Sequence, residues 1–256
     1  MQAQVGGIVK TSTKSYWSPW LLIFVPGLIV AAIVLFAQTE KISAMRLPLD
    51  SLNGLEIVDG KAEITTYNGR RALHLAPLPD HQKTDESVLA IVTATDFKDG
   101  TIEAEVAAAP RAGAPADSRG FIGILFRAQE HGARGENFYL RPTNGRADDQ
   151  LRRNHSVQYE SLPDFPWNRL RKESPGVYES YEDLEVGVWT KMKIVVSGTK
   201  AQLYVNGADQ PCLIVNDLKL GDTNGQIGLW AHATTDGYFS NLVVRAAKQR
   251  ARIYRK

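Results

Sequence analysis

The feature that most constrains this chain is a long run without a charged residue, Trp17 to Ala37. At a rise of about 1.5 Å per helical residue, the run reaches roughly 30 Å, the thickness of the hydrocarbon core of a bilayer. It is longer than the apolar region of a secretory signal, about 7–15 residues, and no good small-x-small cleavage site follows it. We therefore expect a membrane anchor; a cleaved signal or a buried helix of the soluble domain is the alternative.

The charges beside this run indicate its orientation only weakly. Lys10 and Lys14 precede it and Lys41 and Arg46 follow it, so the positive residues are nearly balanced. A short N-terminal tail before a long domain is typical of a signal-anchor. We therefore expect the domain on the periplasmic side of a bacterial inner membrane, as part of a single-pass protein. The aromatic residues expected at the inner headgroup level are Tyr16, Trp17 and Trp20.

Small residues give the expected anchor helix a face on which a partner could pack. Gly27 and Ala31 are four positions apart and share a helical face, and small residues let another helix approach closely. Pro26 removes a backbone donor and should kink the middle of the helix. Other integral membrane subunits are then the expected partners. Because Gly and Ala are common in membrane helices, the alternative is a face without a specific partner.

The rest of the chain divides by composition. We expect an N-terminal tail over 1–16, the anchor over 17–37, a linker over 38–50, one β-rich domain over 51–246 and a basic tail over 247–256. The net charge is +2, which gives no reason to expect a nucleic-acid partner. The single cysteine, Cys212, excludes an internal disulfide and a cysteine-based metal cluster. It is expected to be a small buried residue of a strand.

Short β-runs separated by turn residues follow the anchor. In Gly100–Ala107, apolar Ile102, Ala104 and Val106 alternate with Glu103 and Glu105, the pattern of a half-buried strand. No helix is expected after the anchor. The predicted strands are Leu55–Val58, Ala62–Thr66, Ala72–Leu75, Val88–Thr95, Gly100–Ala107, Gly120–Ala128, Glu136–Arg141, His155–Glu160, Trp189–Ser197, Ala201–Val205, Cys212–Val215, Gln226–His232 and Tyr238–Val244.

The closing half of the domain resembles concanavalin A-like jelly rolls. The resemblance rests on W-x-x-x-K-I-V-V from Trp189, L-Y-V-N-G from Leu203, G-x-I-G-L-W from Gly225 and F-S-N-L-V-V from Phe239. These motifs resemble the laminin-G-like proteins and the bacterial 3-keto-disaccharide hydrolase domain family. The resemblance implies an all-β fold, a two-sheet antiparallel sandwich (jelly roll) preceded by the one transmembrane helix, with a concave face that often meets sugar. It does not imply one activity, because such folds serve lectins, glycosidases and structural domains alike.

No catalytic residues can be assigned from the sequence. Family 16 glycosidases of this fold carry E-x-D-x-x-E, but after Glu103 and Glu105 the third acidic position holds Ala108. No metal site or cofactor is predicted, and the five histidines are scattered. A single calcium ion on Asp148, Asp149 or Asp236 is a weaker alternative to solvated turn acids.

The best site candidate is the segment Pro142–Glu185, expected to be a long loop with one strand through it. A loop of this length in a compact domain is usually functional. Aromatic faces stack on sugar C–H surfaces, and Arg and Gln give planar hydrogen bonding. Trp230 could join this groove, although core positions are favoured for Trp189 and Trp230. The candidate ligand-binding residues are Arg127, Tyr139, Arg141, Arg152, His155, Gln158 and Trp167.

Three functions are consistent with the sequence. The favoured one is a non-catalytic, membrane-anchored accessory or structural subunit of a larger integral membrane complex, because the anchor offers a packing face and no catalytic set is found. The second is a membrane-anchored carbohydrate-binding protein that uses the segment 142–185. The third is a glycan-active hydrolase of the 3-keto-disaccharide type, so an enzyme is not excluded.

Overall fold

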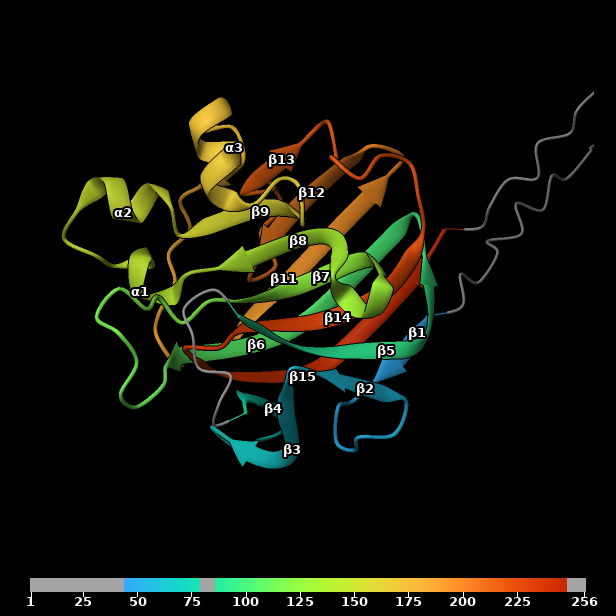
Figure 1. Ribbon diagram of the computed structural model, residues 1–256. Helices are drawn as coiled ribbons and strands as arrows, with labels where there is room; N and C mark the ends of the chain where they lie inside the picture. Colours follow the sequence, from blue (N-terminus) through green and yellow to red (C-terminus); the bar gives the residue numbers. More distant parts are fainter. Residues whose placement is uncertain (1–43, 79–85, 248–256) are drawn as a thin grey trace, which may run out of the picture. The chain divides into compact units, whose positions relative to one another are not determined.

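The computed structural model describes residues 44–78 and 86–247. These residues form an antiparallel sandwich of two sheets, so the predicted all-β, jelly-roll-like fold is confirmed (Figure 1). The expected anchor over 17–37, with Tyr16, Trp17, Trp20, Gly27 and Ala31, lies outside the described residues. Within the described part of the chain, no helix is long and apolar enough to cross a bilayer. The predicted domain boundaries stay predictions.

One sheet has eight strands, seven of which follow one another in space. Their order is β13 (Leu213–Val215), β12 (Lys200–Val205), β11 (Thr190–Ser197), β6 (Gly100–Pro110), β15 (Thr235–Ala246), β4 (Arg70–Pro77) and β3 (Gly60–Tyr67), while β1 (Met45–Leu47) also pairs with β15. The alternation predicted for β6 is confirmed: Ile102, Ala104 and Val106 are at most 1 % exposed. Glu103 and Glu105 stand on the other face, where Glu103 pairs with Lys191.

The second sheet has seven strands. Their order is β10 (Glu179–Ser180), β9 (Val157–Leu162), β8 (Arg134–Leu140), β7 (Ile122–Gln129), β14 (Gly225–His232), β5 (Ser87–Phe97) and β2 (Leu55–Val58). The strand predicted at His155–Glu160 is thus present as β9, with shifted ends.

The expectation that no helix follows the anchor is wrong. The segment predicted as a long loop contains α1 (Pro142–Gly145), α2 (Gln150–Asn154) and α3 (Trp167–Glu173), and the 3-10 turn η1 (Glu130–Gly132) precedes β8. These helices are four to seven residues long, too short for a period of about 3.6 residues to show in the sequence. They gather beside β8 and β9 (Figure 1).

The main core lies between the sheets, but the seven-stranded sheet also carries a smaller apolar cluster on its outer face. Neighbouring residues of a strand point to opposite faces. Phe138 and Leu140 of β8 therefore face the main core, while Tyr139 belongs to the outer cluster. The buried members of that cluster are Leu89, Ile91, Leu125, Ala128, Tyr139 and Trp230. Each of these side chains is at most 5 % exposed, so neighbouring segments of the domain already cover the cluster.

Two other predictions concern single residues. Cys212 is only half-buried, although it packs against the main core, and burial raises the pKa of its thiol to about 12. The core position favoured for Trp189 is wrong. Its ring is half-buried, its indole N–H donates to the Tyr67 carbonyl at 3.3 Å, and the guanidinium of Arg70 lies 5.3 Å from the ring centroid.

Candidate functional site

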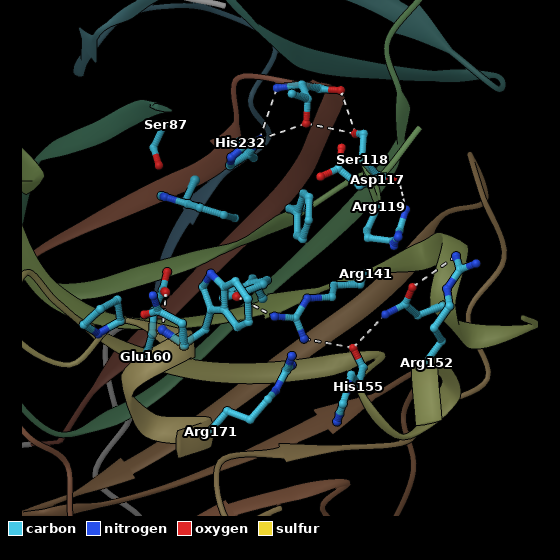
Figure 2. Close-up of a pocket in the computed structure, with 18 of the residues that line it drawn as sticks. Ser87, Asp117, Ser118, Arg119, Arg141, Arg152, His155, Glu160, Arg171 and His232 are labelled. Atoms are coloured by element: carbon cyan, nitrogen blue, oxygen red, sulfur yellow. Dashed lines mark hydrogen bonds between the residues drawn. The ribbon is translucent and has the colours of Figure 1, made fainter. Parts of the chain in front are cut away.

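A pocket of about 640 Å³ lies over the outer apolar cluster of the seven-stranded sheet. This volume is in the range of small-molecule sites, about 300–1,000 Å³. The sheet supplies the floor through β8, β9 and β14, and the short helices α1, α2 and α3 supply walls. Figure 2 shows polar side chains from these elements facing one another around the hollow.

The floor is an aromatic pair that meets across a glycine. Gly123 of β7 is opposite both Tyr139 of β8 and Trp230 of β14. Because Gly123 has no side chain, the two rings reach each other, with centroids 5.0 Å apart. The core position favoured for Trp230 is confirmed by its 3 % exposure, yet the ring also lines the pocket. Its indole N–H has no hydrogen-bond partner among the described residues.

Arg141 carries a buried positive charge beside this floor. Its side chain donates to the Tyr139 hydroxyl at 2.9 Å and to Gln158 Oε1 at 3.2 Å. It also donates to the carbonyl of His155 at 3.0 Å. All these acceptors are neutral, and the guanidinium makes no ion pair with a described residue. It lies 5.0 Å from the ring centroid of Tyr139 and 5.6 Å from that of Trp167.

The wall on α3 is built by Trp167 and Arg171, which stand one helical turn apart. Arg171 approaches the Trp167 ring centroid to 4.7 Å, so two guanidinium groups lie close to this indole. Arg171 Nη2 donates to Glu179 Oε2 at 2.6 Å, and His155 Nε2 lies 3.1 Å from Glu179 Oε1. Burial, followed by the charge of Arg171, lowers the pKa of His155.

Glu160 supplies a buried carboxyl group to the pocket. Its Oε1 accepts from Asn137 Nδ2 at 3.1 Å, and its Oε2 accepts from the backbone N–H of Trp167 at 3.3 Å. Its side chain has no ion pair with a described residue. Burial raises the pKa of Glu160 above its ordinary value of 4.5. A carboxyl with a raised pKa can act as a general acid or base near neutral pH.

Two further arginines stand at the rim. Among the described residues, Arg119 donates only to backbone carbonyls, those of Ala116 at 3.0 Å and Ser118 at 3.1 Å. Arg152 of α2 reaches Asn144 Oδ1 at 3.5 Å. Burial lowers the pKa of Arg119, and so do the positive charges of Arg152 and Arg141, while the charge of Asp117 partly offsets them. Arg119 is therefore close enough to both Arg152 and Arg141 for their like charges to repel.

The structure brings most of the sequence-predicted site residues together. Those that line the pocket are Tyr139, Arg141, Arg152, His155 and Trp167. Gln158 does not line it but lies beneath it, fully buried, and orients the Arg141 guanidinium. Whether these residues bind a ligand stays a prediction.

Arg127 lies away from the pocket. Its side chain is fully buried and donates to the carbonyls of Gly221 at 2.6 Å, Gly198 at 2.7 Å and Lys98 at 2.9 Å. Arg127 has a φ of 53° at a register shift between β7 and β8, so a bulge re-aims its side chain. It joins loops of the sandwich rather than facing a ligand.

Several lining residues were not among those predicted from the sequence. Glu160 follows Gln158 in the alternation of β9, a signal that was present in the sequence. Arg171 follows Trp167 by one helical turn, a signal that required α3 to be recognised. The other lining residues outside the prediction include Arg119, Phe121, Asn144 and His232.

The acids considered for calcium lie apart. Asp149 Oδ1 accepts from the Arg152 backbone N–H at 2.7 Å and caps α2, and Asp236 Oδ1 is 3.5 Å from His74 Nε2. Within residues 44–78 and 86–247, no three His, Cys, Asp or Glu side chains come together as a metal site would need.

Solved structures with the same fold include sugar-binding proteins. The carbohydrate-binding module CBM66 from Bacillus subtilis is 15 % identical with a TM-score of 0.52, covering 75 % of this chain and 95 % of that one. A Bacillus subtilis protein of unknown function with a galectin-like fold is 14 % identical, with a TM-score of 0.54 and coverages of 80 % and 96 %. The exoplasmic/lumenal domain of VIP36, bound to Ca²⁺ and mannose, is 9 % identical, with a TM-score of 0.53 and coverages of 83 % and 93 %.

At these identities the structural likeness shows the fold alone. No curated protein matches the chain. A family model, described as the 3-keto-alpha-glucoside-1,2-lyase-like domain, matches residues 41–245. This match spans most of the chain and agrees with the resemblance found in the β11 to β15 motifs. The chain therefore belongs to the family of 3-keto-alpha-glucoside-1,2-lyase-like domains.

Proposed function

We propose that the chain is a membrane-anchored carbohydrate-binding protein whose ligand lies on the Tyr139–Trp230 floor. The observation that carries the proposal is this aromatic pair at the bottom of a pocket of about 640 Å³. A sugar ring has an apolar C–H face that stacks on aromatic rings and a rim of hydroxyls that needs hydrogen-bond partners. The pocket offers both, since Trp167, Arg152 and Asn144 stand around the floor.

The comparisons support this proposal at the level of ligand class. The CBM66 structure is named as a carbohydrate-binding module, the VIP36 domain was solved with mannose, and the matched family is named for a glucoside. All three point to sugars.

A glycan array tests the proposal with two matched variants. Trp167 and Tyr181 are each 41 % exposed, and each lies under an arginine, since Arg153 is 5.0 Å from the Tyr181 ring centroid. Only Trp167 lines the pocket. We expect Trp167→Ala to weaken binding to the best glycan about tenfold, a loss of about 1.4 kcal/mol, and Tyr181→Ala to leave it unchanged. An equal effect of the two variants, or no glycan bound, would refute the proposal.

The membrane part of the proposal rests on the sequence of residues 17–37. The apolar run supports a single-pass protein of a bacterial inner membrane with its domain in the periplasm, and Gly27 and Ala31 support a helix partner in a larger complex. Gentle extraction followed by sizing tests the accessory role. We expect co-purifying subunits that Gly27→Leu removes. Ile29→Leu is the control, because residue 29 would face about 200° away from residue 27 on a helix. A small monomer in every extract would contradict the accessory role.

A second candidate function is an elimination reaction in the same pocket, favoured by the buried carboxyl of Glu160 and by the family name. The keto group at C3 of a 3-keto-α-glucoside acidifies the proton at C2. Glu160 as carboxylate would take that proton, the C2–H electrons would form the C1–C2 double bond, and the C1–O bond would break. The alcohol leaves with that electron pair and gains a proton.

The unsaturated ketone formed in this reaction absorbs ultraviolet light, which gives a direct assay. We expect turnover of a 3-keto-α-glucoside to fall at least 100-fold in Glu160→Gln, within the usual range for general acid–base catalysis. Glu182→Gln is the control, because burial also raises the pKa of Glu182 but this residue does not line the pocket. Absence of turnover by the unmodified protein would exclude this candidate and leave the binding role standing.

A further inference from the structure

Three arginines of the pocket carry positive charge that no ion pair with an acid of the described residues neutralises. Arg119, Arg141 and Arg152 line the pocket and make no ion pair with a residue of 44–78 or 86–247. Other arginines of the domain do pair: Arg146 with Asp183 at 2.9 Å and Arg171 with Glu179 at 2.6 Å. Figure 2 shows Arg141 in the middle of the view, with Arg119 and Arg152 on one side of it and Glu160 on the other.

This arrangement works against the stability of the empty pocket. Like charges held close together raise one another's free energy, most strongly where burial limits solvent screening. Arg141 is only 4 % exposed, and its positive charge reaches both Arg119 and His155. Clustered positive charge around a cavity is typical of a site that binds a ligand of opposite charge.

The acids near the pocket do not supply that charge. Glu160 is buried, and its carboxyl is bonded to neutral donors, Asn137 Nδ2 and the Trp167 N–H. The carboxylate of Glu179 already contacts Arg171 and His155. Asp117 lines the pocket and its charge partly offsets that of Arg119, and Asp149 accepts from the backbone N–H of Arg152. Neither acid makes an ion pair with a described residue, so neither holds one of the three guanidinium groups.

The donors left over are placed for a ligand. Among the described residues, Arg119 Nε and Nη2 and Arg152 Nε and Nη1 have no hydrogen-bond acceptor, because the bonds of these side chains use Arg119 Nη1 and Arg152 Nη2. Arg141 is different, since four bonds to neutral acceptors fix its guanidinium. It therefore contributes a fixed charge, while Arg119 and Arg152 contribute open donors.

We propose that the sugar bound in this pocket is acidic, with a carboxylate or sulfate group held by Arg119 and Arg152 beside the charge of Arg141. The proposal rests on the carbohydrate-binding function proposed above and names its ligand class. A planar guanidinium presents two parallel N–H groups to two oxygens of a carboxylate or sulfate, a geometry that a neutral hydroxyl does not match. The sugar ring then lies on Tyr139 and Trp230, and its acidic group points to the rim.

An array of the same oligosaccharides in neutral, uronic acid and sulfated forms tests the proposal on the full chain in detergent. We expect the acidic form of a bound sugar to bind at least tenfold more tightly than its neutral form, with an affinity that falls as salt rises. Preference for the uronic acids or for the sulfate esters identifies which acid is recognised.

Neighbouring arginines of α2 give the matched variants. Arg152 lines the pocket, whereas Arg153 donates to the Tyr181 hydroxyl at 2.7 Å and does not line it. We expect Arg152→Gln to reduce the affinity for the acidic form about tenfold and that for the neutral form by much less, so that the preference for the acidic form falls. Arg153→Gln should change neither.

The outcomes separate the two proposals. Equal binding of neutral and acidic forms, without salt dependence, would overturn the acidic ligand and keep the carbohydrate-binding function. Binding of acidic forms that Arg152→Gln and Arg153→Gln weaken equally would place the acidic group outside this pocket. No binding of any form would overturn both proposals.

Discussion

The rings of Tyr139 and Trp230 lie 5.0 Å apart although a whole strand runs between them. Tyr139 is on β8 and Trp230 on β14, and Gly123 of the intervening β7 is opposite both. An added Cβ at Gly123 would lie 2.2 Å from the carbonyl oxygen of Phe138 and 2.6 Å from the Cβ of Tyr139. The floor of the pocket therefore depends on a residue that contributes no side chain to it.

Gly123→Ala is expected to lower the free energy of unfolding by about 1–3 kcal/mol, the usual range for overpacking. The nearest atoms belong to the backbone and to a Cβ, so the strand itself must move. Urea unfolding measures the loss, and glycan affinity should fall with it. Gly237→Ala in β15 is the control, because its added Cβ would meet nothing closer than 3.1 Å. Equal losses in the two variants would contradict the role assigned to Gly123.

Arg127→Lys should destabilise the fold and leave glycan binding intact. The Arg127 side chain is fully buried and donates to the carbonyls of three loop residues, Lys98, Gly198 and Gly221. A lysine cannot reproduce this planar set of donors, and each buried carbonyl left unpaired costs about 1–3 kcal/mol. We expect a total loss of about 3–5 kcal/mol in urea unfolding.

The exposed Arg169 provides the comparison for Arg127. It forms an i,i+4 pair with Glu173 on α3, and such pairs contribute only about 0.3–0.5 kcal/mol. Arg169→Lys should therefore be nearly neutral. An Arg127→Lys protein with normal stability but reduced sugar affinity would contradict this structural role. It would support the prediction from the sequence that Arg127 binds the ligand.

The strands were predictable because their signal is local, whereas part of the site was not. The alternation of Ile102, Ala104 and Val106 follows from the burial of one strand face, and a few consecutive residues are enough to detect it. The position of the Arg127 side chain depends on a bulge at which Arg127 has a φ of 53°. No neighbouring residue in the sequence indicates this bulge. The placement of Gly123 between Tyr139 and Trp230 depends on the register of three strands. The local sequence does not show this register either.

The site segment shows the same division. Tyr139 and Arg141 were predictable as members of one strand face that leads into a long polar segment. Trp167 and Arg171 come together only because α3 forms, and seven residues give too few turns for a helical pattern to be seen. Glu160 was passed over although it shares a strand face with Gln158, because a single acid in a strand does not reveal its burial.

Tyr159→Phe is expected to disrupt a buried hydrogen-bond network that joins β8 and β9 to the segment after β13. The Tyr159 hydroxyl donates to Glu136 Oε2 at 2.6 Å and accepts from the Lys219 backbone N–H at 2.9 Å. Without it, both groups lose a buried partner, so we expect the free energy of unfolding to fall by about 2–4 kcal/mol. Tyr204→Phe is the control, because the hydroxyl of this half-buried residue bonds to a single described side chain, Gln202, at 2.9 Å. Equal and small losses would show that the network is not stabilising.

Glu160→Gln should make the protein more stable at neutral pH and less sensitive to pH. Burial raises the pKa of Glu160 above 4.5, so the folded protein binds this proton more tightly than the unfolded chain. The resulting stability is fully present below pH 4.5 and is lost as pH rises through the raised pKa. Glutamine stays neutral throughout and avoids that loss.

The change to glutamine also fits the local hydrogen bonds. Asn137 Nδ2 donates to Glu160, and Asn137 Oδ1 has no partner among the described residues. A half-turn of the Asn137 amide would place that oxygen opposite the new amide N–H, while the glutamine oxygen accepts from the Trp167 N–H. We would measure the free energy of unfolding in urea between pH 4 and pH 8. The difference in favour of the variant should grow as pH rises and become constant above the raised pKa of Glu160. Burial also raises the pKa of Glu136, but this residue is present in both proteins and its contribution cancels. Parallel pH profiles would contradict the buried, proton-binding state assigned to Glu160.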